Sequence, residues 1–131
     1  MLRININGKI RVSTDKNGNI LSLQRNGDRD TDGAQMVNLI DNLEYTYDTN
    51  NKNLLVKVDD DSSSPQGFKN GSNTGNDYVY DANGNMTIDN NKGIRKIVYN
   101  HLNLPTAINF GGKSYGIDIQ ITCIITQDRV I

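Results

Sequence analysis

The stretch YVYDANGNMTID, residues 78–89, decides the fold class of this chain. The segments on either side of DANG have the composition and the period of two that are typical of β-strands. The Asn-Gly at the end of DANG is a turn signal, because both residues readily adopt the positive φ that a tight hairpin needs. Although an Asp followed by Asn-Gly-Asn also suggests a cation-binding loop, the flanking strands favour a structural turn. The stretch therefore predicts a β-hairpin.

The same pattern occurs three more times along the chain. Strand-like segments are paired across turn clusters at 9–14 with 19–25 (DKNG), 43–48 with 53–58 (TNNK), and 93–99 with 104–110 (NHLN). The chain has 131 residues, with 20 Asn and 12 Gly but only 3 Ala, so turn formers outnumber helix formers. The sequence predicts an all-β chain built from about four irregular β-hairpins.

The turns align with one another, as a repeat requires. The residues that begin the turns are Asp15, Asp48, Asp81 and Asn100, at intervals of 33, 33 and 19 residues. The residues that precede the last three turns are Tyr47, Tyr80 and Tyr99, and those that resume the strand in the first three are Ile20, Leu54 and Met86. Two polar segments, 25–35 and 59–77, interrupt the period and are predicted to be long surface loops.

The segments YTYDTNNKNLL and YVYDANGNMTIDNNKGIRKIVYNHLNLPTAINF resemble the YD repeats of the Rhs family, in the form found in Bacteroides and related bacteria. That pattern is an aromatic residue, any residue, Tyr-Asp, two residues, Gly-Asn or Gly-Arg, then Leu or Met. Residues 15–27 resemble it less specifically, and the resemblance covers roughly residues 9–110. The positions that carry the repeat signature are Tyr47, Asp48, Tyr80, Asp81, Gly84, Tyr99 and Asn100.

The resemblance implies that the hairpins add side by side into a curved antiparallel sheet, which in large family members spirals into a hollow shell. Such shells enclose or carry a variable C-terminal segment, often a toxin. The resemblance therefore implies a non-enzymatic structural scaffold, secreted or at the cell surface, whose partners are a C-terminal toxin or effector segment or further YD repeats. Four repeats are few for a whole shell, and the pattern stops after residue 112. We expect a fragment or truncated member, with a YD-repeat region at 1–112 and a divergent, β-prone tail at 113–131.

The tyrosines support either of two roles. Those in the repeat strands are Tyr45, Tyr47, Tyr78, Tyr80 and Tyr99, and the chain has no Trp. Packed between hairpins, they would form cross-strand aromatic pairs, worth about 0.2 to 1 kcal/mol each. Exposed, they would make the chain a cell-surface module that binds carbohydrate or protein. Their place at the positions that define the repeat favours packing.

The segment DRDTDG is the strongest metal candidate. Asp28, Asp30 and Asp32 alternate before Gly33, as in calcium loops of the EF-hand type. Such a loop needs a bidentate Glu at its twelfth position, where this chain has Leu39. The sequence therefore favours a solvated, Asp-rich loop, and we predict neither a metal site nor a cofactor site.

Catalytic groups are sparse. The chain has one His, His101, in a predicted turn, and one Cys, Cys123, in an apolar strand-like run that favours burial over reactivity. Asp118 and Asp128 are isolated from any marked partner, and GGK at 111–113 is too short for a phosphate-binding loop. We predict no catalytic residues and no enzymatic activity, with a cysteine or metal enzyme as the third alternative.

Charge and hydropathy limit the partners. The net charge is −1 and the charges are scattered, which does not favour binding to nucleic acid or to an anionic membrane. The first ten residues lack the apolar run of a signal peptide, and no later segment has transmembrane length. The apolar segment 117–126 is predicted either to fold back onto the sheet or to cause self-association.

Overall fold

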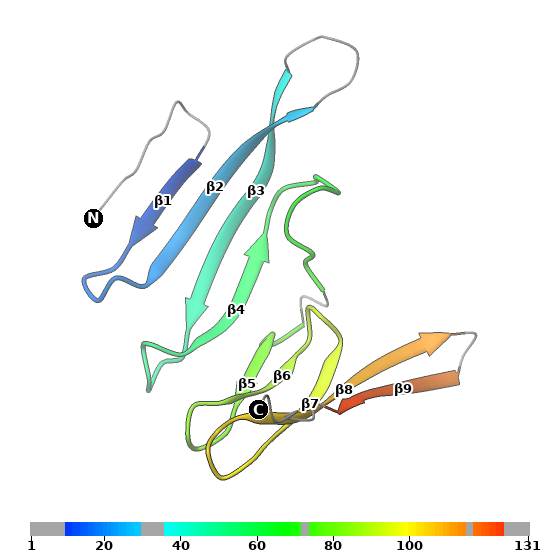
Figure 1. Cartoon of the computed structure of the whole chain (residues 1–131). Helices are drawn as coiled ribbons and strands as arrows, with labels where there is room; N and C mark the ends of the chain where they lie inside the picture. The colour runs from blue at the N-terminus through cyan, green and yellow to red at the C-terminus, as the bar shows by residue number, and fades with distance from the viewer. Residues whose placement is uncertain (1–9, 30–35, 72–73, 115–116, 125–131) are drawn as a thin grey trace, which may run out of the picture. The chain divides into compact units, whose positions relative to one another are not determined.

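The structure is a computed structural model that describes residues 10–29, 36–71, 74–114 and 117–124. These residues form antiparallel strands joined by turns and loops, and none of them is helical (Figure 1). The prediction of an all-β chain is confirmed. The chain divides into two compact units, residues 1–70 and 71–131, and each has its own sheet.

The first unit contains a four-stranded sheet in the order β1-β2-β3-β4, so every strand pairs with its neighbours in sequence. Its strands are β1 (Ile10–Thr14), β2 (Ile20–Arg29), β3 (Met36–Tyr47) and β4 (Leu55–Asp60). The β1–β2 and β3–β4 hairpins are the first two that the sequence predicts, and both are confirmed.

The second unit contains a five-stranded sheet in the order β5-β6-β7-β8-β9, again with neighbours in sequence paired. Its strands are β5 (Tyr78–Tyr80), β6 (Met86–Asp89), β7 (Ile94–Tyr99), β8 (Pro105–Ser114) and β9 (Ile117–Ile124). The β5–β6 and β7–β8 hairpins confirm the other two predictions. Strand β9 pairs with β8 from Ala107↔Ile124 to Ser114↔Ile117, so this segment folds back onto the sheet, the first of the two outcomes expected for it.

All four predicted hairpins contain a β-bulge at the same place. In each, the first residue of the second strand pairs with the last residue of the first strand, and the next residue of the second strand is skipped in the register. The skipped residues are Leu21, Val56, Thr87 and Thr106. A bulge adds local right-handed twist, so its repetition gives every hairpin the same twist next to its turn. The hairpins are therefore repeats in geometry as well as in sequence.

The bulges correct two details of the predicted register. Leu54 does not resume the strand, because the second turn is two residues longer than the first and β4 begins at Leu55. In the third hairpin Tyr80 pairs with Met86 and Tyr78 pairs with Asp89, whereas a regular hairpin without a bulge would pair Tyr78 with Ile88. The extra residue in β6 shifts every pair beyond it by one position.

The prediction of a surface loop at 25–35 is wrong for its first part. Residues up to Arg29 continue β2 and pair with β3, from Asn26↔Leu39 to Arg29↔Met36. Gly27 leaves room for the side chain of Ile40, which a Cβ at position 27 would displace. The polar composition of this part of β2 gives no strand signal, and its register is set by pairing with β3. Residues 30–35, and with them most of the calcium candidate, lie outside the described residues.

The loop predicted at 59–77 is shorter than expected. Asp59 and Asp60 belong to β4, and Asp77 at the other end is fully buried. Between them, the described residues 61–71 and 74–76 form bends and turns, as predicted.

The described part of the chain has a small apolar core. Its buried hydrophobic residues are Leu43 and Val58, with 8% and 3% of their surface exposed. The buried polar residues are three aspartates, Asp41, Asp77 and Asp89. Because few described apolar side chains are fully buried, hydrogen bonds that fix the turns and loops contribute to the specificity of the fold.

Candidate functional site

The four predicted turns are closed by one pattern of hydrogen bonds. In the turn between β5 and β6, the Asp81 carboxylate accepts the backbone N–H groups of Asn83 and Asn85, both at 2.9 Å. The Asp81 N–H donates to the Asn85 carbonyl at 2.8 Å, and the Gly84 N–H donates to the Asp81 carbonyl at 3.1 Å. This is an Asx motif, in which the first side chain of the turn accepts the backbone N–H groups that follow it.

The other three turns repeat this pattern with small changes. Asp15 accepts the N–H groups of the residues two and four positions later, at 2.8 and 2.9 Å. Asn100 does the same with its side-chain oxygen, at 2.9 and 3.1 Å. Asp48, which begins the longer turn, accepts the N–H groups of Asn50 and Asn51, both at 2.8 Å. An amide oxygen thus replaces the carboxylate where the chain has Asn.

A left-handed residue occupies the fourth position of three turns. These residues are Gly18, Gly84 and Asn103, with φ of 87°, 82° and 59°. Gly and Asn tolerate this conformation better than other residue types, which explains the Asn-Gly signal in the sequence.

The turn geometry lowers the pKa of two aspartates. The pKa of Asp15 is lowered chiefly by the hydrogen bond from the Asn19 side-chain amide, and that of Asp81 chiefly by the bond from the Asn85 backbone N–H. Each donor favours the ionised carboxylate. Each carboxylate therefore favours its ionised form and serves as the acceptor that closes its own turn.

Neighbouring turns within each unit are joined by asparagine side chains. In the first unit, the Asn19 amide donates to the Asn53 side-chain oxygen at 3.1 Å. In the second, the Asn85 amide donates to the Asn103 side-chain oxygen at 2.9 Å. Asn19 and Asn85 are the last residues before β2 and β6, while Asn53 and Asn103 occupy equivalent places in the following turns. The two contacts are therefore the same contact in two repeats.

A tyrosine forms the second link between hairpins. The Tyr47 hydroxyl donates to the Ile20 carbonyl at 2.8 Å, and the Tyr99 hydroxyl donates to the Met86 carbonyl at 2.6 Å. Each donor is the last residue of its strand, and each acceptor is the first residue of the second strand in the preceding hairpin. The signature tyrosines at these two positions join one repeat to the one before it.

Burial raises the pKa of both tyrosines. For Tyr47 the next cause is the charge of Asp15, and for Tyr99 it is the charge of Asp81. Each ring thus lies near the turn carboxylate of the preceding repeat, and each hydroxyl stays neutral and able to donate. Burial also raises the pKa values of Tyr78 and Tyr80.

A third polar cluster, around Asp41, was not predicted from the sequence. This buried carboxylate receives the Arg25 side chain at 2.5 Å and the Phe68 N–H at 2.6 Å. Gly67 allows the close approach, because a Cβ there would collide with Asp41 and with the Ile40 carbonyl. The Ser62 hydroxyl also donates to the Ile40 carbonyl, at 2.7 Å. Together these contacts hold loop 61–70 against β3.

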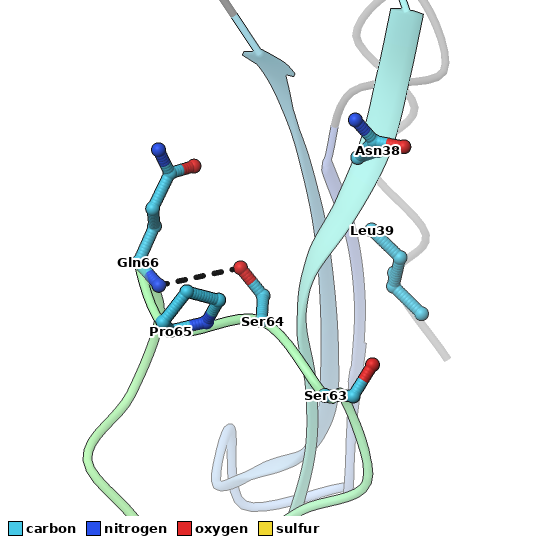
Figure 2. Close-up of a pocket in the computed structure, with 6 residues that line it drawn as sticks. All are labelled: Asn38, Leu39, Ser63, Ser64, Pro65 and Gln66. Carbon is cyan, nitrogen blue, oxygen red and sulfur yellow. Dashed lines mark hydrogen bonds between the residues drawn. The ribbon is translucent and has the colours of Figure 1, made fainter.

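A pocket of about 250 Å³ lies between this loop and β3 (Figure 2). Its lining residues are Asn38, Leu39, Ser63, Ser64, Pro65 and Gln66. The Gln66 N–H donates to the Ser64 hydroxyl at 3.3 Å. These six described residues are neutral and include neither an ionisable side chain nor an aromatic ring, so they supply no acid, base or nucleophile with an activated partner.

The remaining sequence candidates lie in different elements of the second unit or outside the described residues. His101 is exposed in the turn before β8, and Cys123 pairs through its backbone with Ile108, although its side chain is outside the description. Asp118 lies in β9, and Asp128 is outside the described residues. Within the described part of the chain, no group of three or more His, Cys, Asp or Glu residues could hold a metal ion. The described residues also include no helix long and apolar enough to cross a membrane.

The fold and its contacts define a class: an all-β chain whose hairpin repeats are joined by side chains at equivalent positions. In comparisons with known proteins, no protein-family model, curated protein or solved structure matches the chain.

Proposed function

We propose that the chain is a non-enzymatic structural scaffold, a segment of an Rhs-type YD-repeat protein that helps to form the shell or carrier of a C-terminal toxin or effector. The observation that carries the proposal is the pair of equivalent links between hairpins, Tyr47 to Ile20 and Tyr99 to Met86. In each link, a residue of the YD signature joins its own hairpin to the preceding one.

The chemistry of these links suits an array. The tyrosine acceptor is a backbone carbonyl, which every repeat presents whatever its side chains are. The asparagine link likewise uses one amide as donor and one as acceptor, so it works wherever Asn recurs in the turn. Contacts of this kind tolerate sequence variation between repeats, as a repetitive wall requires.

The tyrosines favour the scaffold over the carbohydrate- or protein-binding module. Tyr47 and Tyr99 are partly buried, and their hydroxyls are engaged by the main chain of the neighbouring hairpin. A ring held in this way supports packing and leaves less of its face for a sugar.

The scaffold proposal is tested by the coding sequence that flanks this chain and by the protein it specifies. We expect further YD repeats upstream and a segment of different composition downstream. The downstream segment should resist protease in the full-length protein and become sensitive when the repeats are unfolded in urea. A full-length protein without further repeats, or with a downstream segment that is digested equally in both states, would contradict the carrier role.

A glycan array tests the alternative on the same preparation. Specific binding that Tyr80→Ala abolishes, in a variant that remains folded, would favour the binding module. Loss of folding without prior glycan binding would support the packing role.

A further inference from the structure

The dipeptide Asn-Gly occurs five times in this chain. In this dipeptide the backbone nitrogen of the glycine can attack the Asn side-chain carbonyl carbon with the least hindrance, because glycine has no side chain. The attack releases ammonia and so deamidates the asparagine. Four occurrences lie in the described residues: Asn17-Gly18, Asn26-Gly27, Asn70-Gly71 and Asn83-Gly84. The reaction needs a side-chain amide free to move and a following N–H that can lose its proton. The structure shows which of the four Asn-Gly sites meet these two requirements.

Two of the four are restrained by the surrounding structure. Asn26-Gly27 lies within β2, where Gly27 pairs with Asn38 under the side chain of Ile40. At Asn70-Gly71, the Gly71 N–H donates to the Asn91 side-chain oxygen at 2.9 Å. The Asn70 side-chain amide also donates to the Asp60 carbonyl, at 3.4 Å. Both sites are therefore held by contacts to residues outside their own turn, which the attack would have to break.

The remaining two form a matched pair. Asn17 and Asn83 occupy the same position of equivalent turns, and each donates its own N–H to the carboxylate that begins the turn, at 2.8 and 2.9 Å. The following N–H groups, of Gly18 and Gly84, donate to the carbonyls of Asp15 and Asp81 at 3.2 and 3.1 Å. The backbone environments are therefore nearly identical.

The side chains differ. The Asn83 amide donates to the Asn103 side-chain oxygen at 3.3 Å, which ties it to the next turn. Asn17 is exposed, and its side-chain amide makes no hydrogen bond among the residues that the structure describes. Asn17 thus combines an exposed turn, an unhindered Gly and a side chain that can rotate toward the Gly18 nitrogen.

We propose that Asn17 is a site of spontaneous self-modification, at which the chain converts its own asparagine into isoaspartate and aspartate. The Gly18 nitrogen loses its proton to hydroxide and attacks the Asn17 side-chain carbonyl carbon. The bond from that carbon to Nδ2 breaks, ammonia leaves with one added proton, and a five-membered succinimide forms. Water then opens the ring at the main-chain carbonyl, giving isoaspartate, or at the side-chain carbonyl, giving aspartate. No oxidant or reductant is required.

The product changes the turn in two ways. Either product places a new carboxylate two residues from Asp15, whose own carboxylate closes the turn. Isoaspartate also adds a methylene to the main chain between residues 17 and 18, which lengthens a loop closed by the Gly18-to-Asp15 hydrogen bond. Modification therefore loosens the first turn and its Asn19 link to the second turn.

The test measures deamidation at each site. The folded chain is incubated at pH 8.5 and 37 °C, conditions chosen to favour amide deprotonation, and digested in ¹⁸O-water so that deamidation during digestion is distinguishable by mass. Fragment-ion spectra then locate each mass increase. We expect Asn17 to react roughly fivefold faster than Asn83, the factor that one ordinary hydrogen bond supplies. Equal rates at these two sites, or faster reaction at Asn26 or Asn70, would overturn the proposal.

Two variants isolate the cause. Asn103→Gly keeps a residue suited to positive φ but removes the acceptor, so Asn83 should accelerate to near the rate of Asn17. Lys16→Ala makes both stretches read DANGN, and Asn17 should remain the faster site. In urea the gap between Asn17 and Asn83 in the Lys16→Ala chain should close. If the difference in deamidation rate between Asn17 and Asn83 persists in urea, or if Asn103→Gly leaves it unchanged, the folded structure does not cause it and the proposal is contradicted.

Discussion

At the scale of single residues, the first position of each turn shows which property of aspartate the fold uses. Asp81 and Asn100 make equivalent pairs of hydrogen bonds to backbone N–H groups. The acceptor oxygen is therefore essential to the turn, whereas the negative charge is not. Because the chain has Asp at this position in one turn and Asn in another, Asn is the substitution for Asp81 that should keep the turn.

We predict that Asp81→Asn keeps the third hairpin and that Asp81→Ala weakens it. The alanine leaves the N–H groups of Asn83 and Asn85 without their acceptor, and water replaces it less well in a constrained turn. Thermal unfolding followed by circular dichroism should show a lower Tm for the alanine variant than for the asparagine variant. A Tm for Asp81→Asn as low as that of Asp81→Ala would mean that charge, and not geometry, closes the turn.

The same carboxylates predict a dependence on acid. The pKa values of Asp15 and Asp81 are lowered in the folded chain, so the stability they contribute is present above the ordinary aspartate value of about 3.9. It is lost as the pH falls through the lower folded values. The double variant Asp15→Asn/Asp81→Asn should therefore lose less stability than the wild type between pH 5 and pH 2 in urea titrations. An unchanged acid slope would contradict this assignment.

The hydroxyls of Tyr47 and Tyr99 predict a second effect. Tyr99→Phe removes the bond to the Met86 carbonyl and should lower the free energy of unfolding by about 0.5 to 1.5 kcal/mol. Tyr78→Phe is the matched control, since the Tyr78 hydroxyl accepts only a long 3.5 Å contact from Asn91. Urea unfolding should show the larger loss for Tyr99→Phe, and a reversed order would argue against the repeat link.

Alkaline pH provides an independent check on Tyr99. Its pKa is raised in the folded chain by burial and then by the charge of Asp81, so the associated stability is present below about pH 10 and is lost as the pH rises through the folded value. Tyr99→Phe should accordingly lose less stability than the wild type between pH 9 and pH 12.

At the scale of elements, the four hairpins could be predicted because their signals are local. A turn such as DANGN contains its acceptor, its donors and its left-handed glycine within five residues. The extension of β2 through Arg29 could not be read in this way, since its polar residues become a strand only by pairing with β3. The links between hairpins join residues 13 to 34 positions apart, and no local pattern specifies such partners.

Loop 61–70 is a second element that local patterns do not predict. Its polar composition correctly indicates a loop, but its position depends on Asp41, a strand residue 27 positions before Phe68. The alternation of β3 indicates nothing about which buried polar side chain will receive a distant N–H. The pocket beside this loop depends on the same long-range contact, so sequence reasoning missed it as well.

The close approach at Gly67 gives a prediction for this element. In Gly67→Ala the added Cβ would collide with Asp41 and with a backbone carbonyl that cannot rotate away, so the loop must shift from β3. Overpacking of this kind costs about 1 to 3 kcal/mol. Hydrogen exchange should show faster exchange of the Phe68 N–H, while the N–H groups of the β1–β2 hairpin stay protected. Ser63→Ala, an exposed change in the same loop, serves as the control, and unaltered Phe68 exchange in Gly67→Ala would contradict the role assigned to Asp41.

At the scale of the whole molecule, both units are single sheets in which each strand pairs with its neighbours in sequence. Such a sheet grows by adding strands at its edge, and its backbone ladder supplies much of the cohesion that a small apolar core does not. The same design leaves edge strands that can pair with other chains. In the second unit β9 covers the long strand β8 from Ala107 to Ser114 and thereby replaces it as the edge strand of the sheet.

The role of β9 as an edge cover leads to a prediction on association. A chain truncated after Ser114 exposes the ladder of β8, a 10-residue strand that is longer than the 8-residue β9, and we expect it to form oligomers or aggregates at concentrations where the full chain does not. Truncation after Ile124 keeps β9 and is the matched control. Light scattering should show the shift in mass only for the shorter chain, and circular dichroism should verify that both remain β-structured. If both truncated chains have the mass of the full chain, β8 is protected in another way, and the covering role of β9 is wrong. Association of both variants would instead place the protection in residues 125–131.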